Sequence, residues 1–142
     1  MNAFSLADKI QKVWPSLKMA THRQPGHIWI RDLAFYVPPV ADADRLIHWR
    51  KWWQVWQKPA YVPGRHDCDD FALKTAYEVQ QACSSVYPLA FGICDVTECQ
   101  HATGKHSINI LVCDDEIILY DPQTDLRWFA EPSLDKPYFI RV

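Results

Sequence analysis

Three residue types that together can activate a thiol occur in a fixed order along the chain. Cys68 follows a Pro63-Gly64 turn and begins a predicted helix, His106 opens a predicted strand, and Asp121 ends the next strand. A cysteine attacks a carbonyl as its thiolate, a histidine takes the proton, and a carboxylate holds the imidazole in one tautomer and orientation. The pattern predicts Cys68 as nucleophile, His106 as base and Asp121 as the orienting group.

The helix predicted over residues 68–83 gives this thiol a particular electrostatic setting. The residues that recur at intervals of three and four and so define one face of this helix are Cys68, Ala72, Thr75, Ala76, Val79 and Cys83. We expect Asp67 to cap the helix, with Asp69 and Asp70 in its first turn. Unpaired backbone N–H groups at a helix start stabilise a thiolate, whereas neighbouring carboxylates oppose it, so the thiol needs a cationic partner such as a histidine.

Strand alternation predicts that His106 and Asp121 meet. With a turn at residues 114–115, Ile110 lies opposite Leu119, and the apolar rows of both strands face the same side. His106 and Asp121 are then diagonal neighbours with Cβ atoms about 7 Å apart. A slip of one residue would separate them. Ser107 and Asn109, which alternate onto the other face, receive no predicted role.

An oxyanion that develops during attack on a carbonyl needs donors. The backbone N–H of Cys68 is one candidate. The second donor stays open among Tyr61, Gln54, Gln57 and a helix tryptophan.

The remaining elements place this site in an α+β chain. We expect a helix over residues 5–14 with Ser5 as its cap, a short strand at 28–30, an extended piece at 33–37 and a helix over 42–57. Further strands are predicted at 89–96, 106–112, 116–120, 126–130 and 138–141. Helices come first and antiparallel strands follow, which is typical of an α+β fold with N-terminal helices packed on an antiparallel sheet.

Tryptophans gather on one face of the helix predicted over 42–57. The four are Trp49, Trp52, Trp53 and Trp56. We interpret them as core residues, and the alternative is that one or two form a wall of a substrate cleft beside Cys68.

Composition limits the classes of function. The chain has 142 residues, which fits one domain, and its 49% hydrophobic and 23% charged residues are typical of a globular protein. A net charge of −2 without a basic run gives no reason to expect nucleic-acid or membrane binding. The first 17 residues are too polar for a secretory signal, so the five cysteines are interpreted as reduced thiols of a cytoplasmic protein.

Three segments resemble the transglutaminase-like cysteine peptidase superfamily, especially its small bacterial and phage-type members. They are Asp67-Cys68-Asp69-Asp70-Phe71-Ala72, Gly104-Lys105-His106-Ser107-Ile108-Asn109 and Leu119-Tyr120-Asp121-Pro122. The resemblance covers roughly residues 61–123. Two departures are Lys105 where that family more often has glycine, and residues 1–60, which match nothing in the family pattern.

The resemblance implies a single papain-like domain over residues 1–142, with a helical N-terminal part at 1–60 and a catalytic core at 61–142. It also implies a cysteine peptidase or amidase that needs no cofactor or metal and acts on a peptide or protein amide through Cys68, His106 and Asp121. Hydrolysis is favoured over transamidation because no feature for a second substrate stands out. The oligomeric state stays open.

Two other readings of the sequence remain. Cys94, Cys99, His101 and His106 are donors within 13 positions, although their spacing lacks the paired short intervals of structural zinc sites. The other reading is a protein-binding module that keeps the fold but not the chemistry.

Overall fold

A computed structural model describes residues 1–20, 24–43, 45–47, 62–63, 67–83 and 85–142. The helices are α1 (Ala3–Val13) and α3 (Cys68–Ala82), and residues 40–43 and 45–47 are also helical. The strands are β1 (Lys18–Ala20), β2 (His27–Trp29), β3 (Phe91–Val96), β4 (His106–Val112), β5 (Ile117–Asp121), β6 (Leu126–Phe129) and β7 (Pro137–Arg141).

All seven strands join one sheet in the order β1-β2-β7-β3-β4-β5-β6. The five strands from β7 to β6 pair antiparallel, as the α+β prediction requires. The prediction of a purely antiparallel sheet is wrong, because β1 pairs parallel with β2, and β2 pairs parallel with β7. The N-terminal part of the chain therefore contributes two strands as well as helix.

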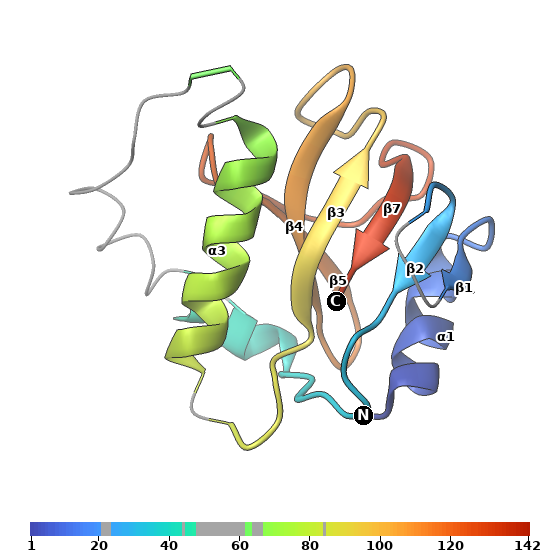
Figure 1. The fold of residues 1–142 in the computed structure, drawn as a ribbon, viewed down its shortest axis with the longest axis vertical. Helices are drawn as coiled ribbons and strands as arrows, with labels where there is room; N and C mark the ends of the chain where they lie inside the picture. The colour runs from blue at the N-terminus through green and yellow to red at the C-terminus, as the bar shows by residue number, and fades with distance from the viewer. Residues whose placement is uncertain (21–23, 44, 48–61, 64–66, 84) are drawn as a thin grey trace.

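The central strand β4 is buried on both faces. Its Ile108, Ile110 and Val112 pack with Leu6 and Ile10 of α1 in one core cluster. On the other face, Leu111 packs with Val79 of α3 and with Ile47 in a second cluster. The sheet thus separates α1 from α3, as Figure 1 shows. Each helix covers one face because alternate residues of a strand point to opposite sides.

The cap of α1 differs from the prediction. The side chain of Asn2 accepts a hydrogen bond from the backbone N–H of Ser5 at 2.8 Å, so Asn2 is the N-cap and the helix begins at Ala3. Ser5 lies inside the first turn. An amide oxygen of asparagine satisfies a free N–H as well as a serine hydroxyl does, and the sequence offers both.

The predicted helix over 42–57 lies mostly outside the described residues. Its described part already begins at residue 40 and includes residues 45–47, where Ile47 is buried. Trp49, Trp52, Trp53 and Trp56 are outside the described residues. The extended piece at 33–37 belongs to no named strand, although Ala34 and Tyr36 each form an isolated bridge, with Asn2 and Leu89 respectively.

Gly92 allows β3 and β7 to approach closely. A Cβ added at this position would overlap the backbone carbonyl of Arg141 on the neighbouring strand. Backbone atoms inside a sheet cannot move aside cheaply, and overpacking of this kind costs about 1–3 kcal/mol or more.

We therefore expect Gly92→Ala to lower the free energy of unfolding by at least about 2 kcal/mol in urea titrations. Gly26→Ala is the matched control, because nothing lies within 4 Å of its added Cβ and only the positive φ of 77° is unfavourable. That strain costs about 1–2 kcal/mol. Equal losses in the two variants would show that the strand contact at Gly92 is not tight.

Candidate functional site

His106 and Asp121 form the hydrogen bond that the predicted register requires. The Nε2 atom of His106 lies 3.1 Å from Oδ2 of Asp121, and both side chains are largely buried. The register is confirmed in detail, since Ile110 pairs with Leu119, and Val112 pairs with Ile117. Because a carboxylate only accepts hydrogen bonds, Nε2 carries the proton in the neutral ring and Nδ1 keeps a lone pair.

The Asp121 carboxylate is held by a shell of donors. Burial raises the pKa of Asp121, but hydrogen bonds from His106, from the backbone N–H of Gln123 and from the hydroxyl of Thr124 outweigh burial and hold the pKa below its ordinary value of 3.8. The Gln123 bond is 2.8 Å and the Thr124 bond is 3.0 Å. The carboxylate is thus ionised at neutral pH and fixed from three sides.

Cys68 is the first residue of α3, as predicted. It lies on the same helical stripe as Ala72, Thr75 and Val79, which are buried against the sheet. The Cys68 side chain itself is partly exposed. Its position at the helix start, with a thiol on the side that faces the sheet, is the one that the sequence analysis assigns to the nucleophile.

Two groups of hydrogen bonds define the direction of α3 on the sheet. Near its start, Nδ2 of Asn109 donates to the Ala72 carbonyl at 2.8 Å and to the Gly92 carbonyl at 3.0 Å. Near its end, the Gln80 amide bonds to the backbone of Leu89 at 2.7 and 2.9 Å. Leu89 comes just before β3, whose first residue, Phe91, pairs with Leu111 near the end of β4. The end of α3 therefore lies near the end of β4, and α3 runs in the same direction as β4.

This direction places Cys68 toward the end of β4 that begins with His106. Figure 1 shows the start of α3 at the end of the sheet where β3 stops, and Val96 at that end pairs with His106. His106 alternates with Ile108 and Ile110 of the α1 face, whereas α3 covers the opposite face. Cys68 and His106 therefore lie toward the same end of the sheet, on elements of opposite faces.

The structure brings His106 and Asp121 together, but it joins Cys68 to neither by a hydrogen bond within the described part of the chain. An attack on a carbonyl would require the substrate to lie between the start of α3 and the end of β4.

The carboxylates around Cys68 are arranged differently from the prediction. Asp67 occupies the N-cap position but makes no side-chain capping bond. A hydrogen bond with Asp67, then burial, and then the negative charge of Asp67 raise the pKa of Asp69. The Asp67 carboxyl, which was predicted to accept a backbone N–H as the cap, is instead hydrogen-bonded to Asp69, and the two side chains repel each other when both are ionised.

A buried polar pair that the sequence analysis left out lies on the α3 face. Ser107 donates to Oδ1 of Asp95 at 2.5 Å, and both residues are buried. Asp95 pairs with Ser107 across β3 and β4. The sequence signal for this pair is an acidic residue inside a predicted strand. The signal indicates a buried polar pair only once α3 is known to cover this face of the sheet.

Three of the other thiols are poor nucleophile candidates. Burial is the largest cause that raises the pKa of Cys94, of Cys99 and of Cys113, the last to about 11. All five cysteines are free. The zinc alternative finds no support in geometry, because the one group of three or more potential ligands among the described residues consists of Asp67, Asp69 and Asp70.

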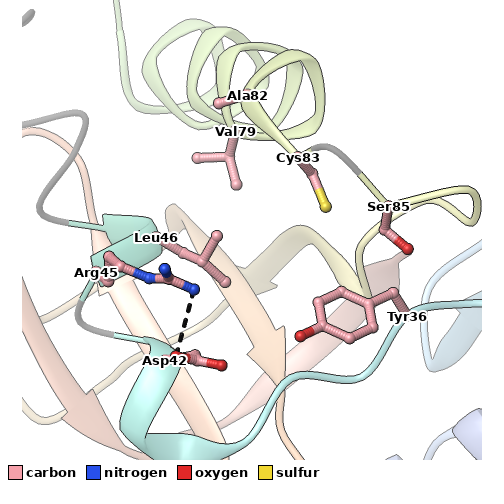
Figure 2. A pocket seen from close by; sticks show the side chains of 8 residues that line it. All are labelled: Tyr36, Asp42, Arg45, Leu46, Val79, Ala82, Cys83 and Ser85. Atoms are coloured by element: carbon pink, nitrogen blue, oxygen red, sulfur yellow. Dashed lines mark hydrogen bonds and ion pairs between the residues drawn. The ribbon is translucent and has the colours of Figure 1, made fainter.

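One hollow lies at the other end of α3, far from Cys68. It has a volume of about 430 Å³ and is bounded by Tyr36, Asp42, Arg45, Leu46, Val79, Ala82, Cys83 and Ser85. Figure 2 shows the Cys83 sulfur pointing into this hollow and the Arg45–Asp42 ion pair at its rim. A smaller hollow of about 140 Å³ adjoins the first turn of α3 and includes Asp69 and Asp95 in its wall.

Comparison with known proteins defines the fold class only. No family model and no curated protein matches the chain. A solved structure described as "PSL1a-E64 complex" matches with a TM-score of 0.69 and 15% identity, over 100% of this chain and 51% of that chain. The chain thus spans about half the length of that protein. At this identity the likeness shows a shared α+β fold.

Within the described ranges, no helix combines the length and the apolar character needed to cross a bilayer.

The depressed pKa of Asp121 predicts a defined loss of stability in acid. Folding favours the carboxylate form, so its stabilisation is complete above the ordinary value of 3.8 and is lost as the pH falls through the lower folded-state pKa. We expect the difference in unfolding free energy between wild type and Asp121→Asn to be constant above about pH 5 and to shrink below it. The measurement is urea unfolding at a series of pH values.

Asp115→Asn, at an exposed turn residue, is the control for this experiment. A difference between wild type and Asp121→Asn that does not change with pH would contradict the proposed stabilisation of the Asp121 carboxylate.

The Asn109 bonds predict a selective effect on α3. Asn109→Leu removes a donor from two buried carbonyls, and we expect it to lower the unfolding free energy by about 1–3 kcal/mol. Hydrogen exchange of the α3 amides should accelerate more than that of the β4 amides. Thr75→Val is the control, because the buried Thr75 hydroxyl donates only within α3, to the Phe71 carbonyl. Uniform acceleration in both variants would argue against a tether between helix and sheet.

Proposed function

We propose that this protein is a transglutaminase-like, papain-like thiol enzyme that catalyses acyl transfer at an amide bond, with hydrolysis as the favoured outcome. The observation that carries the proposal is the His106–Asp121 hydrogen bond at the end of the sheet toward which α3 presents Cys68. An imidazole oriented by a buried carboxylate and a thiol at a helix start are the parts of an activated cysteine nucleophile.

The proposed reaction begins with attack of the Cys68 thiolate on the amide carbonyl. Nδ1 of His106 holds the thiol proton, because Nε2 is occupied by Asp121. The carbonyl oxygen becomes an oxyanion, for which the backbone N–H of Cys68, at the start of α3, is the proposed donor. His106 then delivers the proton to the leaving amine, and the C–N bond breaks to leave a thioester.

Hydrolysis completes the cycle. A water molecule attacks the thioester carbonyl and gives its proton to Nδ1 of His106. The C–S bond breaks, the acid leaves, and the proton returns to the Cys68 sulfur. Asp121 stays ionised throughout, since its hydrogen bonds favour the carboxylate, and it stabilises the imidazolium that forms in each half of the cycle.

A second candidate is a binding module on the same fold. The observation that favours it is that Cys68 makes no hydrogen bond to His106 within the described part of the chain. On that account the His106–Asp121 pair serves stability, and Cys68 reacts like an ordinary thiol.

Alkylation of the native protein by iodoacetamide separates the two candidates. We expect Cys68 to react at least about tenfold faster near pH 6 than an ordinary cysteine thiol does. Mass spectrometry locates the adduct, and the other four cysteines are internal references. His106→Ala should reduce the Cys68 rate at this pH to the ordinary thiol value, because the imidazolium no longer stabilises the thiolate. Asp121→Asn should have a smaller effect.

His101→Ala is the matched control, since it removes a histidine that packs edge-to-face against Trp128 and has no place in the proposed reaction. E64 serves as a second reagent, because the similar solved structure is described as a complex with it. If Cys68 reacts no faster than an ordinary thiol and His106→Ala changes nothing, the enzyme proposal fails and the binding module remains.

A further inference from the structure

The hollow beside the first turn of α3 is lined by both charged and apolar side chains. Its volume is about 140 Å³, and its lining residues are Asp69 and Leu73 of α3, Ile93 and Asp95 of β3, and Phe139 and Arg141 of β7. The pairing of Ile93 with Arg141 and of Asp95 with Phe139 places the four strand residues on one patch of the α3 face. Figure 1 shows α3, β3 and β7, the three elements that contribute these residues.

The hollow lies at the level of Cys68 along the sheet. Asn109 and Ala72 lie at the same position along the strand direction, because Asn109 donates to the Ala72 carbonyl. Cys68 lies four residues earlier on α3, about 6 Å along the axis. Ser107 lies two residues earlier on β4, about 7 Å along the strand. The Asp95–Ser107 pair is therefore beside the helix turn that carries Cys68.

Asp95 is preorganised inside this hollow. Its side chain is only 5% exposed, and the Ser107 hydroxyl fixes Oδ1 at 2.5 Å. The oxygen positions of a buried, hydrogen-bonded carboxylate are set before a ligand arrives, which reduces the cost of ordering them on binding. Asp69 adds a second carboxylate at the exposed rim.

The charges and the apolar walls favour one class of ligand. Among the described lining residues, two carboxylates and the Arg141 guanidinium carry a net charge of −1, which favours a cation over an anion. Leu73, Ile93 and Phe139 provide apolar surface for a methylene stem. Lysine side chains combine such a stem with a compact ammonium group.

We infer that this hollow is a specificity subsite that binds a basic side chain, of the lysine type, on the amide substrate of Cys68. The inference rests on the proposed function, and it names the substrate class. Asp95 and Asp69 bind the ammonium group, the apolar walls bind the stem, and the scissile carbonyl lies toward the start of α3. Arg141 offsets part of the negative charge, so the carboxylates are not left as an isolated acidic pair.

The test measures binding without turnover. The Cys68→Ser protein is titrated, with NMR detection, with the methylamides of N-acetyl-lysine, N-acetyl-norleucine and N-acetyl-glutamate. Norleucine has nearly the stem of lysine but no charge. We expect the lysine compound to bind about tenfold more tightly than the norleucine compound, as a charge-assisted hydrogen bond allows, and the glutamate compound to bind most weakly.

Variants then assign the preference to the hollow. Asp95→Asn keeps an acceptor for Ser107 and removes the charge, and Asp69→Asn removes the charge at the exposed rim, where folding is not at risk. Either change should bring the lysine and norleucine affinities to within about threefold of each other. Asp70→Asn is the matched control, because Asp70 is in the same turn but does not line the hollow.

The inference is overturned if the lysine compound does not bind saturably, if glutamate binds as tightly as lysine, or if the preference survives both Asp95→Asn and Asp69→Asn. These outcomes are separable from failure of the proposed function. A lysine preference in a protein whose Cys68 is not activated by His106 would leave the subsite in place on a binding module. An activated Cys68 without the preference would leave the enzyme and remove the subsite.

Discussion

The side chain of Asn109 is the contact on which the geometry of the candidate site depends. Its amide nitrogen bonds the Ala72 carbonyl of α3 and the Gly92 carbonyl of β3 at the same time, in a fully buried position. Its Oδ1 has no hydrogen-bond partner in the described part of the chain, so the residue is kept at a cost in unsatisfied polarity. This fixed point and the parallel course of α3 and β4 place Cys68 toward the end of the sheet at which β4 begins with His106.

The two faces of the central strands place different polar groups at the same end of the sheet. His106 and Asp121 are among the alternate strand residues that face α1. Asp95 and Ser107 are among the alternate strand residues that face α3. Cys68 begins α3, toward the same end of the sheet. Under the proposed function, the first pair would serve the chemistry and the second pair would serve recognition of the substrate.

Short-range sequence patterns predicted the parts of the candidate site that are set by neighbouring residues in the chain. The bounds of β4, the register of β4 with β5 and the start of α3 at Cys68 follow from strand alternation, a turn at residues 114–115 and an acidic first turn. The parallel pairing of β2 with β7 joins residues more than a hundred positions apart, and no short-range signal carries it. Asn109 and Asp95 were missed for a related reason. A buried polar residue shows its role only when its partner on another element is known.

The central proposal is that the Cys68 thiol and the His106 imidazole meet at the end of the sheet. A short reagent with two alkylating carbons, 1,3-dibromoacetone, tests this directly in the native protein, since it can bridge a thiol to a nearby imidazole. Mass spectrometry should find an intramolecular link between Cys68 and His106, and no such link in Cys68→Ser. Alkylation of Cys68 without a link to His106, or a link from Cys68 to another residue instead, would contradict the account.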